Sequence, residues 1–255
     1  MKKIVGVILI IISIFFLYEG FIGLGYMLSN RLYNKNLRKA IISKSVDEYD
    51  EIDNIDNSLN RIIDFDKLKS INEDIKAWLY IPETKIDYPI LSGESDEEYL
   101  YKGINKEYTP LGSLFSFSGT DFTKGNTTIF GHNMAGNQMF GELKKYIYKD
   151  FLKEHRYLYI YTESKVIKCD IFSIFIANEN DNIFKTEYEL ETEEYVSFIE
   201  EINKRNNYSD YYLDLSDINN SKRQVFSLIT CYGSEGTNER LVVNAIESDL
   251  LNLTQ

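Results

Sequence analysis

The chain has 255 residues, of which 44% are hydrophobic and 14% aromatic, and its formal net charge at pH 7 is −12. This hydrophobic content is sufficient for a packed core, so the composition excludes a chain that is disordered throughout. An acidic surface repels phosphate groups, which argues against a nucleic-acid-binding protein. The length fits one domain of about 150–200 residues with attached segments.

The N-terminal 30 residues contain an apolar stretch that we expect to anchor the chain in a membrane. Residues 4–18 are almost wholly apolar, Glu19 interrupts the pattern, and residues 20–28 continue it. Together they cover about 25 positions, enough for one membrane-spanning helix. A cleaved signal peptide is the alternative, but no Ala-x-Ala cleavage pattern precedes Ala40. Basic residues flank both ends of the stretch, so the charge pattern does not fix its orientation.

The chain divides into three predicted parts. Residues 1–30 would form a cytoplasmic tip and the transmembrane signal-anchor. Residues 31–64 are polar and compatible with helix, and we expect a partly helical stalk. Residues 65–255 would form the folded domain, because regular hydrophobic patterns begin there.

Short β-favouring runs dominate the third part, which predicts a mostly β fold with some helix. There are eight such runs, at residues 78–81, 86–91, 112–117, 127–132, 157–162, 166–177, 224–231 and 241–247. Eight short runs with little helix between most of them favour a mostly antiparallel barrel. Apolar residues at helical spacing predict helices over about 66–78, 138–153 and 192–206, the last with Val196 on its apolar face.

Three polar residues at the ends of β-runs suggest an acyl-transfer site. Cys231 ends one run, a glycine-containing turn follows, and Arg240 opens the next run, so a hairpin would place the thiol and the guanidinium together. A cation beside a thiol favours the thiolate, the form that attacks carbonyl groups. His132 ends another run and is a candidate general acid–base. Its spacing alone leaves open a purely structural role.

The second cysteine, Cys169, is expected to be buried and unreactive. It alternates with Ile167 and Ile171, so the three side chains would share one face of a strand. A disulfide between Cys169 and Cys231 is the alternative, and it would block the proposed nucleophile. The chain has two histidines and no clustered ligand pattern, so neither a metal site nor a cofactor is expected.

Several motifs resemble, in order, those of class B sortases, the surface transpeptidases of Gram-positive bacteria. The segment Ser227-Leu228-Ile229-Thr230-Cys231 resembles the Thr-Leu-x-Thr-Cys motif of that family. The other matching segments are Trp78-Leu79-Tyr80-Ile81-Pro82-Glu83-Thr84-Lys85-Ile86-Asp87-Tyr88-Pro89-Ile90, Gly112-Ser113-Leu114-Phe115, Gly131-His132-Asn133-Met134 and Met139-Phe140-Gly141-Glu142-Leu143. The resemblance runs from about residue 65 to residue 247.

The resemblance implies a sortase-like closed β-barrel of about eight strands, with an N-terminal helix and a long helix between the sixth and seventh strands. It implies that Cys231 is the nucleophile, that His132 transfers protons, and that Arg240 stabilises the oxyanion or holds the substrate. The substrate-binding positions that it implies are Asp96, Leu100, Phe130, Ile229 and Thr230.

Some of these positions depart from the family pattern. Asp96 stands where class B enzymes often have Asn, Phe130 where they often have Tyr, and Ile229 where small polar residues are common. These changes affect groups that would contact substrate and leave the chemistry intact. The sorting motif is therefore left open.

The resemblance implies a membrane-anchored enzyme whose catalytic domain is extracellular. Such an enzyme cleaves a C-terminal sorting motif of a surface protein and transfers the acyl group to an amine of the peptidoglycan precursor. The alternatives are a pilin-polymerising sortase, a surface cysteine protease acting mainly by hydrolysis, and an inactive binding domain. Papain-like proteases place Cys before His, whereas His132 precedes Cys231 here.

Overall fold

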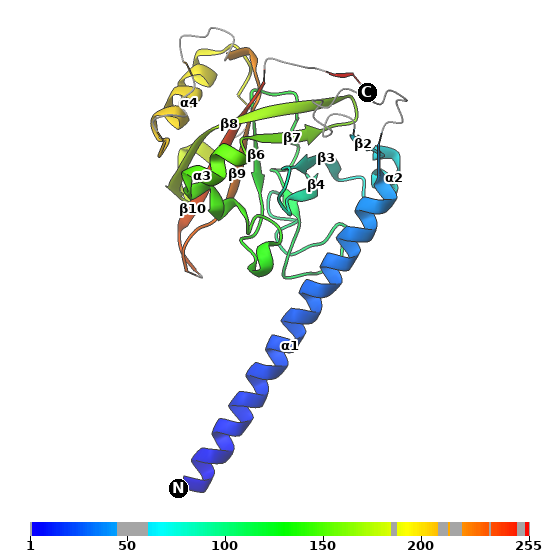
Figure 1. The fold of residues 1–255 in the computed structure, drawn as a ribbon, viewed down its shortest axis with the longest axis vertical. Helices are drawn as coiled ribbons and strands as arrows, with labels where there is room; N and C mark the ends of the chain where they lie inside the picture. The colour runs from blue at the N-terminus through cyan, green and yellow to red at the C-terminus, as the bar shows by residue number, and fades with distance from the viewer. Residues whose placement is uncertain are drawn as a thin grey trace.

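The computed structural model describes residues 2–44, 61–184, 188–208, 214, 221–234, 236–248 and 253–254. Eight strands form a closed barrel, from which one long helix projects (Figure 1). The barrel strands are β3 (Ile75–Tyr80), β4 (Asp87–Leu91), β5 (Leu114–Phe115), β6 (Asn126–Phe130), β7 (Tyr157–Tyr161), β8 (Lys165–Asn178), β9 (Val225–Cys231) and β10 (Glu239–Glu247).

The barrel closes because its first and last strands pair with each other. Neighbouring strands follow the order β10-β9-β6-β5-β4-β3-β7-β8, and β8 pairs back onto β10. The β4–β5 and β6–β9 pairs are parallel, and the other six neighbouring pairs of the barrel are antiparallel. A short strand, β11 (Leu253–Thr254), adds to β8 outside the barrel. The prediction of a mostly antiparallel closed barrel is confirmed.

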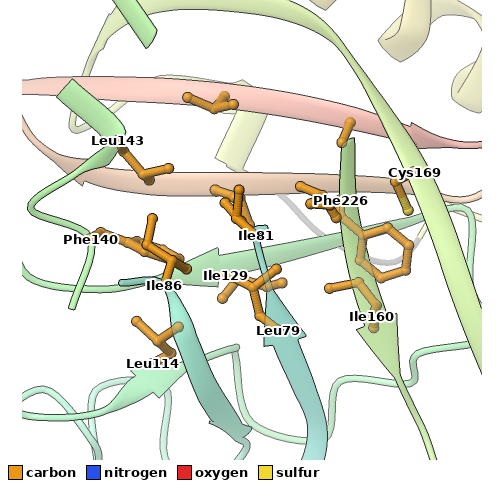
Figure 2. Packing of buried hydrophobic residues seen from close by; sticks show 14 of the residues in the cluster. Leu79, Ile81, Ile86, Leu114, Ile129, Phe140, Leu143, Ile160, Cys169 and Phe226 are labelled. Atoms are coloured by element: carbon orange, nitrogen blue, oxygen red, sulfur yellow. The ribbon is translucent and has the colours of Figure 1, made fainter. Parts of the chain in front are cut away.

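Apolar side chains from every wall fill the inside of the barrel (Figure 2). On β8, Ile167, Cys169 and Ile171 all point into this core, as their alternation predicts. The pairing of β8 with β10 shifts register between Asn244 and Ala245, which marks a bulge. Beyond the bulge Ile174 is the inward residue, so the bulge moves the buried face by one position.

The predicted helix after β8 is α4 (Glu193–Lys204), the long helix between the sixth and seventh barrel strands. Thr192 caps its N-terminus, where its hydroxyl accepts a hydrogen bond from the Tyr195 amide at 3.2 Å. Phe198 and Ile202 lie in a cluster that covers the outer face of β8, β9 and β10. Val196 does not lie on the apolar face as predicted, because its side chain is 39% exposed.

The N-terminal helix α1 (Lys2–Ile41) combines an exposed apolar half with a half that packs on the barrel. Its segment Ile8–Gly25 has a mean hydropathy of 2.2 and is wholly exposed, and it is long and apolar enough to cross a membrane. Signal sequences share those properties. Leu37 and Ile41, near the end of α1, are buried against the domain.

Two short strands and a polar cluster fasten α1 to the barrel. The strand β1 (Ile42–Lys44) pairs with β2 (Arg61–Ile63), which leads to the helix α2 (Phe65–Ile71). The Asp87 carboxylate accepts hydrogen bonds from Trp78 Nε1 at 2.7 Å and from Arg61, and it lies 3.5 Å from Arg38 of α1. Residues 45–60 of the expected stalk lie outside the described residues.

The predicted helix over 66–78 is wrong in its second half. Helix α2 ends at Ile71, and Ile75 and Trp78 belong to strand β3. Asn72 explains the ending, because its side chain accepts from the Asp74 amide and donates to the Ile104 carbonyl. A side chain bonded to nearby backbone competes with continued helix in this way.

The predicted helix over 138–153 is also wrong as a continuous element. The segment contains the 3₁₀ turn η2 (Leu143–Ile147) and the short helix α3 (Lys149–Glu154). Met139 has φ of +50°, and Tyr148 is extended, so neither residue continues a helix. Met139, Phe140, Leu143, Tyr146 and Leu152 of this segment are nevertheless buried, because successive turns direct them into the barrel core.

Candidate active site

Strand pairing brings the three predicted catalytic residues to one end of the barrel. The parallel strands β6 and β9 pair Phe130 with Ile229, so the residues two positions later, His132 and Cys231, emerge at the same edge. In the antiparallel pair β9–β10, Arg240 is the direct partner of Cys231. The hairpin predicted from the sequence therefore forms, with Cys231 exposed at its mouth.

A groove of about 580 Å³ lies at this end of the barrel. All eight residues predicted as catalytic or substrate-binding line it: Asp96, Leu100, Phe130, His132, Ile229, Thr230, Cys231 and Arg240. They come from the segment after β4, from the ends of β6 and β9, and from the start of β10. The arrangement joins an exposed thiol, an imidazole and a guanidinium along one surface.

The imidazole of His132 is held by backbone and by an aromatic ring. Its Nε2 lies 2.8 Å from the carbonyl oxygen of Leu100, and the Tyr101 ring centroid lies 5.5 Å from its own. A carbonyl oxygen only accepts hydrogen bonds, so Nε2 carries a proton in this arrangement. In the neutral ring Nδ1 is then the basic nitrogen.

The backbone around Cys231 is tied to the segment that carries His132. Asn133 Nδ2 donates to the Cys231 carbonyl at 3.1 Å, and Thr230 Oγ1 donates to the Gly131 carbonyl at 2.8 Å. The hydroxyl of Thr230 thus joins β9 to the end of β6. These contacts fix the spacing of the two segments behind the thiol.

The guanidinium of Arg240 is engaged by its own turn and by the end of β8. Its Nη1 donates to the carbonyls of Thr237 at 2.8 Å and Glu239 at 3.0 Å. Its Nη2 donates to the Glu179 carboxylate at 2.6 Å. These contacts orient a side chain that is 21% exposed at the groove.

The other predicted substrate positions shape the walls of the groove. The Phe130 ring stacks on Phe115 with centroids 5.5 Å apart and meets Phe117 edge-on at 5.0 Å. Ile229 is 2% exposed and packs within the α4 cluster. The Asp96 carboxylate accepts from the Ser118 amide at 2.9 Å. Phe130 and Ile229 make this wall apolar, and Asp96 adds a charged rim.

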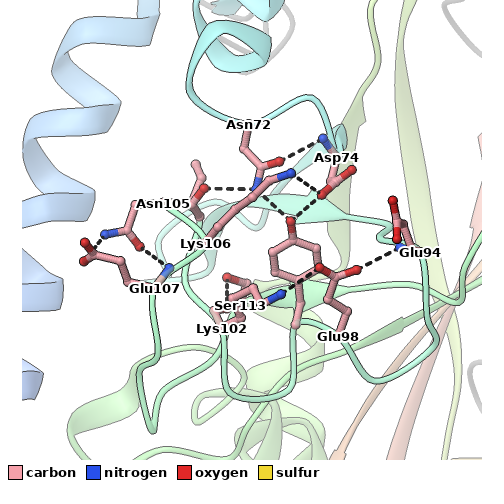
Figure 3. A network of polar contacts seen from close by, with 11 residues as sticks. Asn72, Asp74, Glu94, Glu98, Lys102, Asn105, Lys106, Glu107 and Ser113 are labelled. Carbon is pink, nitrogen blue, oxygen red and sulfur yellow. Dashed lines mark hydrogen bonds and ion pairs between the residues drawn. The ribbon is translucent and has the colours of Figure 1, made fainter.

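A polar network supports the segment of residues 93–113 that carries Leu100 (Figure 3). The buried Tyr99 hydroxyl donates to Asp74 Oδ2 at 2.6 Å and accepts from Asn72 Nδ2 at 2.8 Å. Lys106 forms an ion pair with Asp74 at 3.1 Å. The network anchors the residue directly before Leu100 to the loop between α2 and β3.

Two glycines allow the close approaches that this geometry requires. Gly112 has φ of +55°, and a Cβ there would overlap the backbone carbonyls of Tyr99 (2.8 Å) and Leu100. At Gly131 a Cβ would lie 2.8 Å from an atom of the Phe140 ring. Both glycines belong to the motifs singled out in the sequence. A larger residue would displace the backbone next to Leu100 or His132.

The two cysteines differ in solvent exposure: Cys169 is buried, whereas Cys231 is exposed. Cys169 is fully buried in the barrel core, and both cysteines are free, so no Cys169–Cys231 disulfide is present. Burial raises the pKa of the Cys169 thiol well above its ordinary value. The prediction that Cys169 is buried on the inward face of its strand is confirmed.

Three comparisons with known proteins identify the family. The sortase domain model matches residues 79–248. Sortase B of Listeria monocytogenes is 30% identical over 167 residues, which cover 64% of this chain and 65% of that protein. The X-ray structure of Clostridium perfringens sortase B has 31% identity and a TM-score of 0.65, covering 72% of this chain and all of that one. The Staphylococcus aureus sortase B–substrate complex has 26% identity and a TM-score of 0.63, covering 72% and 83%.

The barrel and these matches together define the chain as a cysteine transpeptidase. It belongs to the sortase family, and its relatives place it in class B.

Three groove neighbours were missed by sequence reasoning. The Tyr101 ring lies tilted against the His132 ring, and Tyr101 directly follows Leu100 in the sequence. Asn133 holds the Cys231 backbone, and it lay inside a quoted motif without a role. Glu179 binds Arg240 from the end of β8, and nothing in its local sequence marks it. Tyr101 and Asn133 could have been predicted from their positions in or beside motifs. Glu179 could be found only from the pairing of the strands.

Proposed function

We propose that this sortase cleaves a C-terminal sorting motif of surface proteins and transfers the acyl fragment to an amine of the peptidoglycan precursor. Cys231 would carry the thioacyl intermediate. The observation that supports this most is the convergence of Cys231, His132 and Arg240 on one groove. Each group supplies one requirement of acyl transfer: a nucleophile, a proton carrier and a fixed cation.

In the first step the Cys231 thiol gives its proton to Nδ1 of His132, and its Sγ attacks the carbonyl carbon of the scissile amide. A carbon–sulfur bond forms, and a tetrahedral oxyanion results. When this intermediate collapses, the carbon–nitrogen bond breaks and the leaving amine takes a proton from His132. Since Nε2–H is bonded to Leu100, we assign this proton transfer to Nδ1. The product of the step is a thioester on Cys231.

In the second step the acceptor amine attacks the thioester carbonyl. Neutral His132 removes a proton from the incoming nitrogen, the carbon–sulfur bond breaks, and an amide forms. Water attacking the same thioester would give a hydrolysed product instead. The ratio of the two products therefore separates a transpeptidase from a surface protease.

Arg240 would stabilise the oxyanion or hold a substrate carbonyl. Its turn carbonyls and Glu179 fix the orientation of the guanidinium, so little rearrangement is needed when charge develops on the carbonyl oxygen. A guanidinium can also direct two N–H donors in one plane at an oxygen, which the ammonium group of a lysine cannot do. We therefore assign Arg240 a directed role.

We further propose that α1 is an uncleaved, single-pass anchor and that the catalytic domain is extracellular. The apolar segment Ile8–Gly25 continues without a break into the helical part that packs on the barrel through Leu37 and Ile41. Cleavage before Ile41 would separate buried contacts of the domain. A membrane location suits an acceptor carried on a lipid-linked precursor.

The test uses the full-length chain in detergent with a peptide that carries a sorting motif, the first choice being the substrate of the Staphylococcus aureus sortase B–substrate complex. Products are separated with and without an oligoglycine or a diamino acid as the amine. The proposal predicts a ligated product that grows with amine concentration at the expense of the hydrolysed one. Hydrolysis unaffected by either amine would contradict the transfer step and support the protease alternative.

A further inference from the structure

Glu179 is an acidic residue of the groove that belongs to none of the motifs and takes no part in the bond changes proposed above. It directly follows the last residue of β8, and its amide donates to the Asn238 carbonyl at 2.8 Å. Its carboxylate Oε2 accepts from Arg240 Nη2 at 2.6 Å. Glu179, just after β8, and Arg240, at the start of β10, thus contact each other at the β8–β10 pairing, on the side of β10 away from β9.

The contacts of Arg240 leave part of its guanidinium for a substrate. A guanidinium has five N–H donors. The carbonyls of Thr237 and Glu239 and the carboxylate of Glu179 use three of them, so two remain as far as the described residues extend. Because both carbonyls bind Nη1, the Glu179 contact is the one that fixes the Nη2 end of the plane. Without it the plane can turn about its remaining contacts.

We infer that Glu179 is a positioning residue that aims the two unused N–H donors of Arg240 into the groove beside Cys231. The inference rests on the proposed role of Arg240 in the reaction. A carboxylate suits the task because a charge-assisted hydrogen bond is shorter and stronger than a neutral one. Both residues line the groove, and Arg240 pairs with Cys231 in the sheet, so a change in the guanidinium plane acts next to the reacting thiol.

The contribution of this ion pair to stability is expected to be small. The Glu179 side chain is 37% exposed, and ion pairs that solvent reaches add little to folding stability. The effect of Glu179 should therefore appear in turnover and not in the unfolding temperature. A misplacement of about 1 Å at a reacting centre can cost about 10²-fold in rate.

The experiment compares Glu179→Ala and Glu179→Gln in the full-length chain, with kcat and KM measured for the peptide ligation described above. We expect Glu179→Ala to lower kcat by at least about tenfold, with KM within about threefold and an unchanged unfolding temperature. Glu179→Gln keeps an acceptor oxygen, so it should recover kcat to within about threefold of the wild type.

A matched control exists two residues further along the chain. Asp181 forms an ion pair of the same length, 2.6 Å, with Arg205, but neither residue lines the groove. Asp181→Ala should leave kcat and KM unchanged. A loss of kcat in Asp181→Ala equal to that in Glu179→Ala would contradict a specific action on Arg240.

The double variant decides whether Glu179 acts through Arg240. Arg240→Lys alone should be impaired, and adding Glu179→Ala should lower kcat less than twofold further, because the group being positioned is already changed. A full additional loss would show that Glu179 acts on the substrate directly and would overturn the inference. An unchanged or increased kcat in Glu179→Ala would overturn it as well. Near-normal turnover in Arg240→Lys would instead contradict the proposed role of Arg240 itself.

Discussion

Replacing Tyr99 with Phe removes one hydroxyl group from the network that supports the active-site segment. That hydroxyl joins Asp74 and Asn72, which lie between α2 and β3, to the residue directly before Leu100. The Leu100 carbonyl in turn holds the imidazole of His132. We therefore expect Tyr99→Phe to lower both the stability of the domain and its turnover.

The magnitude follows mainly from the lost hydrogen bond to Asp74, because Asn72 Nδ2 keeps its bond to the Ile104 carbonyl when the hydroxyl is removed. A bond to a charged group contributes about 1.5–3 kcal/mol. Asp74 keeps its ion pair with Lys106 and is 17% exposed, so the lower end applies, about 1.5 kcal/mol. For a domain of this size that corresponds to a fall in Tm of about 3–6 °C. Turnover should fall by about tenfold, because the support of His132 is loosened and not removed.

The effect on stability should depend on pH with a defined sign. Burial acts to raise the pKa of Asp74, but the hydrogen bonds from Tyr99 and Lys106 and the positive charge of Lys106 outweigh it, so this pKa lies below its ordinary value. The contribution of Asp74 is then complete above its unfolded pKa of about 3.9 and is lost as pH falls through the lower folded-state pKa. Burial and Asp74 raise the pKa of Tyr99, so its hydroxyl stays a donor throughout.

The assay is thermal unfolding of the full-length chain in detergent at pH 7 and at pH 3, for wild type and Tyr99→Phe. The difference in Tm should be full at pH 7 and should narrow below about pH 4. Tyr108→Phe is the control, because Tyr108 is 71% exposed. A difference that does not narrow in acid, or a Tm loss no larger than that of Tyr108→Phe, would refute the reasoning.

Three further outcomes are expected. His132→Ala should lower turnover by about 10²–10⁴-fold in the peptide assay, and a wild-type rate would leave His132 with a structural role only. Gly112→Ala should lower Tm by several degrees and turnover by more than about tenfold, because φ is +55° and a Cβ meets backbone there; an unchanged Tm would contradict that packing. Deleting residues 1–64 should lower Tm by about 10 °C or more relative to deleting residues 1–30, since three side chains buried against the domain are lost at about 2 kcal/mol each. Equal Tm values would show that this segment does not support the barrel.

The sequence predicted the barrel well where the pattern was local. The strand β8 alternates apolar residues along its first part and buries one face, and the capped helix α4 buries one face at helical spacing. Both elements could therefore be predicted from their own residues. The segment 138–153 failed because its apolar residues reach the core through 3₁₀ turns and a positive φ at Met139. Apolar residues at helical spacing therefore do not distinguish a continuous helix from a series of short turns.

The candidate site was predictable to the extent that motifs carried it. Cys231 and Arg240 are close in sequence, so a hairpin argument was enough to pair them. The contact between Glu179 and Arg240 spans 61 positions and depends on the antiparallel pairing of β8 with β10. The hydrogen bond from His132 to the Leu100 carbonyl spans 32 positions. Its acceptor is a backbone oxygen, which every residue type has, so the sequence cannot indicate it.

The most direct test of the account is the mass of the intact full-length chain after brief incubation with the peptide in the absence of an amine. The account predicts an added acyl fragment that is present in wild type and in Cys169→Ala, absent in Cys231→Ala, and discharged by oligoglycine. Cys169 provides the matched control because it is the other free cysteine and is buried. An adduct that persists in Cys231→Ala, or ligation by that variant, would contradict the assignment of Cys231 as the nucleophile.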